Sequence, residues 1–166
     1  MQISILDAAD YHVFWAMLAA FRFDGDRDHY ERCFERHENG EISIIIATVD
    51  GHYAGFCMFN RQPKYSLFKK VGLPEIQDLN VLSSFRRQGI GQALVMFCED
   101  LARRESYEEV GIGVGLDSSY GSAQRLYARM GYIPDGTGVS YDRKPVERGA
   151  LRPIDDHLCL MMTKVL

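Results

Sequence analysis

Two arginines and two glycines stand in residues 79–94 (LNVLSSFRRQGIGQAL), where an expected strand gives way to an expected helix. The first N–H groups of a helix have no partner within it, and they lie at the positive end of the helix dipole. Gly89 and Gly91 let a ligand approach the backbone closely, and Arg86 and Arg87 add positive charge. The pattern predicts an anion site suited to a pyrophosphate. A plain strand-to-helix turn with exposed arginines is the alternative interpretation.

The same segment does not match two well-known nucleotide-binding motifs. The phosphate-binding loop GxxxxGK[ST] is missing from the sequence. The dinucleotide motif GxGxxG is missing too, because Arg86 and Ile90 stand where it needs glycines. The anion site is therefore predicted from the start of the helix and from neither motif.

Three side chains carry groups that can exchange protons. Tyr127 has a phenol, which can donate a proton or a hydrogen bond. It also lies on the apolar stripe of an expected helix, so a purely structural role is the alternative. Glu75 and Asp78 could accept a proton, but residues three apart on a strand point to opposite faces unless the strand contains a bulge. Solvated carboxylates at a strand edge are the alternative for both.

Metal and thiol chemistry are not expected. The adjacent residues Asp155, Asp156 and His157 precede a strand and indicate a turn, and the five histidines lack the HExxH spacing. The four cysteines form no CxxC pair, and three of them lie in apolar runs. We predict a reduced protein with no disulfide framework and no metal site.

Length and charge narrow the class of protein. The 166 residues fit one domain over 1–166, with 46% hydrophobic and 25% charged residues, as in ordinary globular proteins. Nineteen basic against 23 acidic residues give a net charge of -4, which offers no basic footprint for nucleic acid. The sequence has no signal-type start and no apolar stretch of membrane-spanning length. We expect a cytoplasmic protein that binds neither nucleic acid nor a membrane.

The order of expected elements predicts an α/β fold of the mixed (α+β) kind. Two strands near residues 42–59 are joined by an Asp50-Gly51 hairpin turn, and two strand–helix units follow them. Glycines at 111, 113 and 115 leave one face of a strand without side chains, so that another element can pack closely on it. Strands are expected at 1–6, 42–49, 52–59, 75–81, 110–116 and 157–166, and helices at about 8–22, 26–37, 89–104 and 123–130. A loop is expected at 60–74, and a long loop or a hairpin at 135–156. This pattern predicts a mixed sheet with helices on both faces.

Two blocks of sequence resemble the GNAT superfamily of N-acetyltransferases. Residues 86–91 (RRQGIG) match its Q/R-x-x-G-x-G/A signature, between a strand and a long amphipathic helix. Residues 123–132 resemble its A-x-x-L-Y-x-x-x-G-F/Y helix, and the order of elements is similar across nearly the whole chain. One departure is Tyr120, which stands where the family often has asparagine; Asp117 or Ser122 could replace part of its role.

The resemblance implies a GNAT-like acyl-CoA N-acyltransferase fold, with a central, mostly antiparallel mixed sheet and acetyl-CoA as acyl donor. Leu79 to Val81 would pair with the pantetheine arm, Arg86 or Arg87 would help to neutralise the CoA phosphates, and Tyr127 would protonate the departing thiolate. Glu75 stands where some members carry a glutamate base, and a water relay is the alternative. The cofactor-binding residues implied are Leu79, Val81, Arg86, Arg87, Gln88, Gly89, Ile90, Gly91, Gln92, Ala123 and Tyr127.

The predicted function is transfer of an acetyl group to a primary amine by direct attack in a ternary complex. The acceptor is a small-molecule amine or a protein amine, bound by residues 20–40 and the two long loops, with Phe21, Phe23, Asp24, Asp26 and Tyr30 as lining candidates. A catalytically silent acyl-CoA-binding module is the alternative, and an acetyltransferase toxin acting on aminoacyl-tRNA is disfavoured by the acidic charge. A homodimer could form through the apolar C-terminal strand.

Overall fold

The computed structural model describes residues 1–23 and 25–166. The chain forms two compact units, Met1–Arg61 with Gln77–Cys98, and Gln62–Ile76 with Glu99–Leu166. Strand β4 and helix α4 each contribute residues to both units. Within the described part of the chain, no helix combines the length and the apolar character needed to span a membrane.

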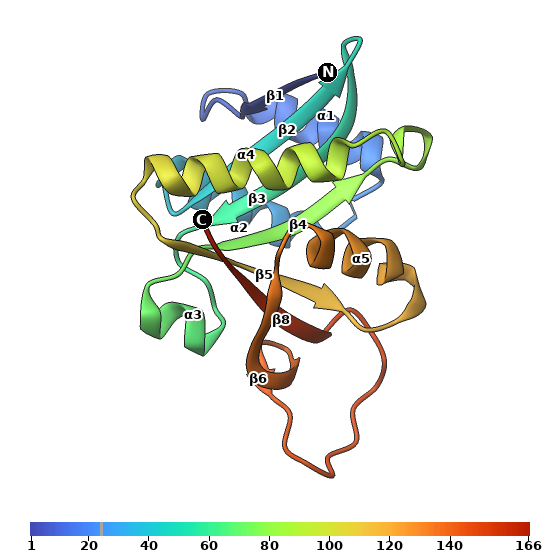
Figure 1. Ribbon diagram of the computed structural model, residues 1–166. Coiled ribbons are helices and arrows are strands. Elements are labelled where there is room, and N and C mark those ends of the chain that lie inside the picture. Colours follow the sequence, from blue (N-terminus) through green and yellow to red (C-terminus); the bar gives the residue numbers. More distant parts are fainter. Residues whose placement is uncertain (24) are drawn as a thin grey trace. The chain divides into compact units, whose positions relative to one another are not determined.

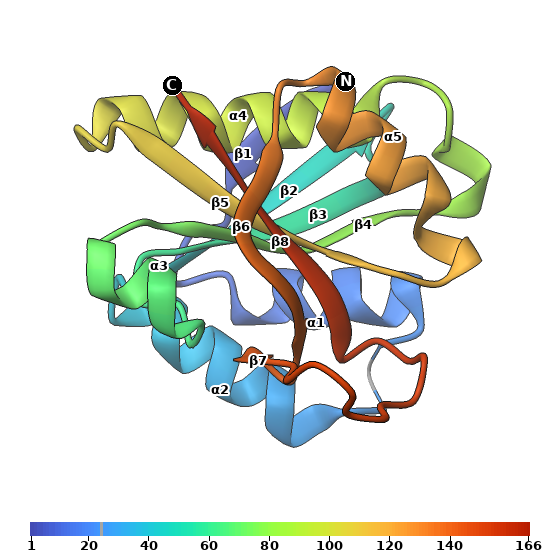
Figure 2. The same cartoon turned by 60° about the horizontal axis from the view of Figure 1, so that its bottom comes forward.

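The first unit is a sheet with helices on both faces. Its strands lie in the order β1-β2-β3-β4, and the described β1–β2 and β2–β3 pairs are antiparallel. The helices α1 and α2 cover one face and the first part of α4 covers the other (Figure 2). The element bounds are β1 Gln2–Ile5, α1 Tyr11–Phe21, α2 Arg27–Glu38, β2 Ile42–Val49, β3 His52–Asn60, β4 Glu75–Val81 and α4 Ile90–Arg104, with a 3₁₀ turn at Ser83–Phe85.

Aromatic and aliphatic side chains from α1, α2 and the sheet form the core of this unit. Phe14 and Leu18 of α1 are fully buried, and Phe34 of α2 lies 5.4 Å from the Phe14 ring, centroid to centroid. The predicted hairpin turn between β2 and β3 is confirmed, because Asp50 and Gly51 both have positive φ (50° and 78°). The apolar face predicted for α1 is confirmed at Phe14 and Leu18, whereas Tyr11 of the same set is exposed.

The second unit contains the rest of the sheet. It runs β4-β5-β8-β6-β7, with β4 and β5 parallel at Glu75↔Gly111 and the other described pairs antiparallel. Strands β5, β8 and β6 lie side by side in yellow, dark red and orange (Figure 1). The bounds are α3 Ser66–Val71, β5 Glu109–Gly115, a 3₁₀ turn at Ser118–Tyr120, α5 Gly121–Arg129, β6 Ile133–Tyr141, β7 Lys144–Pro145 and β8 Leu158–Val165.

The fold class is confirmed as mixed α/β with a mostly antiparallel sheet and flanking helices, but the loop predicted at 60–74 was wrong, because this segment contains α3. Of the two interpretations of residues 135–156, the hairpin is confirmed, because β6 and β7 pair antiparallel there. The proposed route to a homodimer also fails, because β8 pairs with β5 on one side and β6 on the other. The C-terminal strand is therefore not an open sheet edge.

The glycine stripe on β5 lies under side chains of the second unit, as its bare face predicted. A Cβ added at Gly111 would lie 2.2 Å from Cε2 of Phe68 on α3, whereas one at Gly113 would lie 3.1 Å from the flexible Sδ of Met161. The absence of a side chain at Gly111 thus lets α3 pack closely on β5.

Gly111→Ala is expected to destabilise the protein by about 1–3 kcal/mol, because the fully buried Phe68 ring has no room to move aside. Urea unfolding measures the change, with Gly113→Ala as the matched control on the same strand. An equal loss of stability in the two variants would contradict the packing argument.

Candidate functional site

The loop before α4 has the backbone shape of an anion cradle. Arg87 and Gly89 both have left-handed backbones (φ 63° and 83°), and α4 begins one residue later at Ile90. Alternation of left-handed with ordinary residues turns successive N–H groups toward a common point, which is how a backbone nest binds phosphate. Together with the positive end of the α4 dipole, this geometry supports the predicted anion site.

Side chains of the loop hold it to its own unit. The Arg86 Nε donates to the carbonyl oxygen of Val81 (3.1 Å), and the Gln88 Nε2 donates to that of Ser84 (3.2 Å). A tethered loop loses less conformational entropy when a ligand binds. Arg86 therefore ties the loop to the end of β4, the strand predicted to bind the pantetheine arm.

The position of α4 depends on a glycine that sequence reasoning missed. A Cβ at Gly55 of β3 would lie 3.0 Å from the Asn80 oxygen of β4 and 3.0 Å from side-chain carbons of Ile90 and Leu94. Gly55 thus lets β3 approach both β4 and the first turn of α4. Leu79, Asn80 and Val81 of β4 are only half-buried, so this stretch remains accessible.

Asp78 interrupts the regular alternation of β4. Its backbone is left-handed (φ 49°), and its carbonyl accepts a hydrogen bond from the side-chain amide of Asn80 (3.0 Å). A left-handed residue within a strand produces the irregularity that the sequence argument required for Asp78 to share a face with Glu75. Its exposed carboxylate lies 4.0 Å from Nε2 of His29 on α2.

Glu75, at the other end of β4, is fully buried and forms an ion pair with Arg143, in the turn between β6 and β7. The same guanidinium lies 3.9 Å from Sδ of Met161. Both Asp142 and Arg143 have positive φ, as in a type I′ turn. The Glu75 carboxylate is therefore already the partner of a cation, and it stabilises a strained hairpin turn.

Arg143→Met is expected to destabilise the protein by about 3 kcal/mol, because it removes the guanidinium that is ion-paired with the buried Glu75 carboxylate. The double variant Glu75→Gln/Arg143→Met should recover at least half of this loss, since no buried charge remains. Urea unfolding of the two single variants and the double variant completes the cycle. Strictly additive losses would show that the pair contributes nothing.

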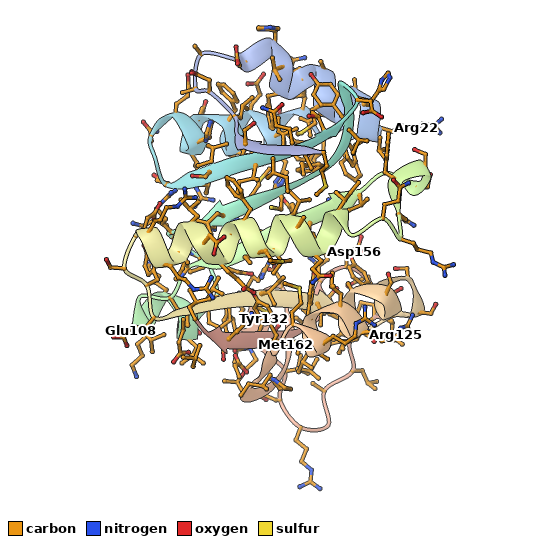
Figure 3. All side chains as sticks on the ribbon, turned by 45° about the horizontal axis from the view of Figure 1, so that its top comes forward. Arg22, Glu108, Arg125, Tyr132, Asp156 and Met162 are labelled. Carbon is orange, nitrogen blue, oxygen red and sulfur yellow. The ribbon has the colours of Figure 1, made fainter. Side chains whose placement is uncertain are left out.

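Tyr127 lies on α5 in the second unit, 4% exposed, with its ring 6.1 Å from that of Tyr132. Figure 3 labels Tyr132, which follows α5, inside this unit, and it labels Arg125 of α5 toward the edge of the unit.

Near the start of α5, the side-chain amide of Gln124 donates a hydrogen bond to the Gly115 carbonyl oxygen (2.8 Å). The Asp117 carboxylate accepts from the Ser119 N–H (2.7 Å). Hydrogen bonds from the Ser119 hydroxyl and then from this N–H lower the Asp117 pKa. Asp117 therefore caps a 3₁₀ turn.

The predicted residues divide between the two units. The loop before α4 (residues 86–89), the accessible part of β4 and Asp78 belong to the first unit, whereas Tyr127, Ala123 and Glu75 belong to the second. Of the acceptor-lining candidates, Phe21 and Phe23 pack on the core of the first unit with Tyr30, Asp26 precedes α2, and Asp24 lies outside the described residues. Residues 1–23 and 25–166 contain no group of three or more side chains that could hold a metal ion.

Two residues that interact with the predicted carboxylates were missed, His29 and Arg143. Neither belongs to a motif, and both meet their partners only through long-range packing. The sequence held a signal for Arg143 alone, because Asp142 and Arg143 are polar turn residues between the two strands of a hairpin.

The chain is similar to known proteins in sequence and in structure. The profile of the acetyltransferase (GNAT) family matches residues 9–132. No curated protein sequence matches the chain. A ribosomal-protein-alanine N-acetyltransferase from Brucella melitensis is similar in structure (TM-score 0.70, 18% identity), with 100% of both chains covered.

Two further solved structures resemble the chain at 18% identity, and each covers 99% of it and 97% of its own chain. They are the aminoglycoside 6'-N-acetyltransferase from Enterococcus faecium (TM-score 0.66) and a GNAT family acetyltransferase from Elizabethkingia anophelis with acetyl-CoA bound (TM-score 0.64). These likenesses show the fold. The profile match covers most of the chain, so the chain belongs to the GNAT family of acetyltransferases.

Proposed function

We propose that the protein transfers an acetyl group from acetyl-CoA to a primary amine by direct attack in a ternary complex. The observation that carries the proposal is the loop before α4, where left-handed Arg87 and Gly89 turn backbone N–H groups outward at the positive end of a 15-residue helix. The family to which the chain belongs and the acetyl-CoA-bound relative support this choice of donor.

The residues of the first unit would bind the donor in sequence order. The N–H groups from Gln88 to Gln92 would hold the pyrophosphate, with Arg86 and Arg87 adding positive charge. The half-buried stretch from Leu79 to Val81 would pair with the pantetheine arm as an added strand. Ala123 would contribute to the cofactor site from α5.

Two proton transfers complete the reaction. Tyr127 would supply the proton that the CoA sulfur takes up as the C–S bond breaks. Asp78 and Glu75 are the two carboxylates proposed for the proton that leaves the amine. Asp78 is exposed, whereas Glu75 is buried and paired with Arg143, so the accessibility of the carboxylate favours Asp78.

Two observations support a proposal for the acceptor: the net charge of the chain and the acceptors named for structurally similar proteins. The relatives act on a ribosomal-protein alanine and on an aminoglycoside, as their names state. We propose a small-molecule or protein amine as acceptor for this chain, because a net charge of -4 suits a cationic partner better than a nucleic acid. We propose the cytoplasm as the compartment of the reaction.

Calorimetric titration with acetyl-CoA, and with free CoA alongside, tests the donor. We expect saturable 1:1 binding of both. Thiol release from acetyl-CoA is then measured with kanamycin, spermidine, a lysine peptide and a peptide with N-terminal alanine. Binding without amine-dependent release would favour the silent acyl-CoA-binding module, and no binding at millimolar acetyl-CoA would overturn the proposal.

A further inference from the structure

His29 and Asp78 form a pair in the first unit that no motif predicted. Nε2 of His29, on the first turn of α2, lies 4.0 Å from Oδ2 of Asp78, and both side chains are nearly half exposed (46% and 41%). The His29 ring also stands edge-on against Tyr30 at 4.9 Å, which limits its rotation. A histidine oriented by a carboxylate is the arrangement that proteins use for proton acceptors.

The pair lies at the expected thioester end of the donor. On the proposed function, the pyrophosphate sits at Gln88 to Gln92 and the pantetheine arm runs back along Val81 to Leu79. The arm therefore travels along β4 away from the phosphates, and the next residue in that direction is Asp78. Because Asp78 is left-handed, the strand bends at this point. The side chains beside the reacting carbon are then Asp78 and its partner His29.

From this placement we propose that His29 accepts the proton of the attacking amine, and that Asp78 acts as the positioning residue that orients the ring. This inference rests on the proposed function, and it replaces direct proton transfer from the amine to Asp78 with transfer to the histidine beside Asp78. In the tautomer that carries its proton on Nε2, the nitrogen that faces Asp78, the lone pair of neutral His29 is on Nδ1. As the C–N bond forms, the proton leaves the amine nitrogen for Nδ1. The C–S electron pair leaves with the CoA sulfur, which takes a proton from its own donor. The imidazolium then returns its proton to solvent.

The electrostatics of the surroundings agree with this role. The neighbouring Asp78 carboxylate raises the pKa of His29 above its ordinary value of 6.5, and Asp26 raises it further. Burial and Arg32 act in the opposite direction, and the thiol of Cys33 lies 3.6 Å from Nε2. A base is active in its neutral form, so kcat should rise with pH through this raised pKa. Without Asp78 the rise should occur at lower pH.

The test is the pH dependence of kcat with the amine from the four-compound panel that gives the fastest thiol release. His29→Gln should lower the maximal kcat at high pH about 100-fold and remove the rise of kcat with pH that we assign to His29. The affinity for acetyl-CoA should stay within about threefold of the wild type. Asp78→Asn should keep this rise but shift it to lower pH. His12→Gln, which removes an exposed histidine of α1, should match the wild type.

The inference would be overturned if kcat of His29→Gln still rose with pH as in the wild type, or if the rise in Asp78→Asn stayed at the wild-type pH. The proposed function would stand in either case. A wild-type protein that releases no thiol with any panel amine would remove both, since the inference depends on turnover. An NMR titration of the His29 ring gives a second measurement. Its pKa should fall in Asp78→Asn, and an unchanged value would show that the carboxylate does not act on the ring.

Discussion

Gly89→Trp is expected to weaken acetyl-CoA binding at least 100-fold, which corresponds to about 2.7 kcal/mol. Gly89 has φ 83°, a backbone that L side chains rarely adopt, and an indole there would occupy the space in front of the N–H groups of the loop. Titration calorimetry with acetyl-CoA measures the loss.

The control for this variant must carry the same backbone strain elsewhere. Gly72, which ends α3, has a similar φ of 71° and also has open space where its Cβ would be. Gly72→Trp should lower the melting temperature as much as Gly89→Trp and leave acetyl-CoA affinity unchanged within about twofold. If Gly89→Trp bound acetyl-CoA as tightly as Gly72→Trp does, the loop would not be the phosphate site.

Tyr127→Phe is expected to lower kcat about 100-fold and to leave the Kd for acetyl-CoA within a few-fold. The phenol would be the source of the proton for the CoA sulfur, and phenylalanine keeps the ring but has no proton to give. Steady-state thiol release with the best panel amine, combined with calorimetry, separates the two parameters.

Tyr132→Phe is the matched control, because Tyr132 is a buried tyrosine whose ring lies 6.1 Å from that of Tyr127. It removes a hydroxyl from the same core of the second unit. Equal kcat values for the two variants would place Tyr127 in the core and not in the mechanism. A fall in acetyl-CoA affinity that matched the fall in kcat would assign Tyr127 to binding.

Local sequence patterns predicted most of the elements and the residues of the phosphate loop. The helix expected at 89–104 is α4 at Ile90–Arg104, and the strand expected at 75–81 is β4 at Glu75–Val81. These two elements could be predicted because the spacing of apolar residues and the positions of glycines depend only on a few neighbouring residues. The short α3 was missed because its six residues are too few to show a helical period, and it is held by Phe68 packed on Gly111.

The environment of each carboxylate could not be predicted, because it depends on residues far away in the chain. Glu75 and Asp78 are alike in the sequence, only three residues apart on one strand. The fold buries Glu75 against Arg143, 68 positions away, and leaves Asp78 exposed beside His29. Cys57 and Cys98 show the same effect, since their sulfurs lie 3.5 Å apart although no CxxC motif joins them.

The sequence by itself determined the family and the positions of the main helices and strands, and it predicted the anion site before α4, because these depend on short-range spacing and backbone preference. Only the tertiary structure decided which charged groups meet. Ion pairs and burial are set by how whole elements pack, and a side chain's neighbours in space bear no fixed relation to its neighbours in sequence. For this reason the histidine beside Asp78 and the arginine on Glu75 emerged only from the folded chain.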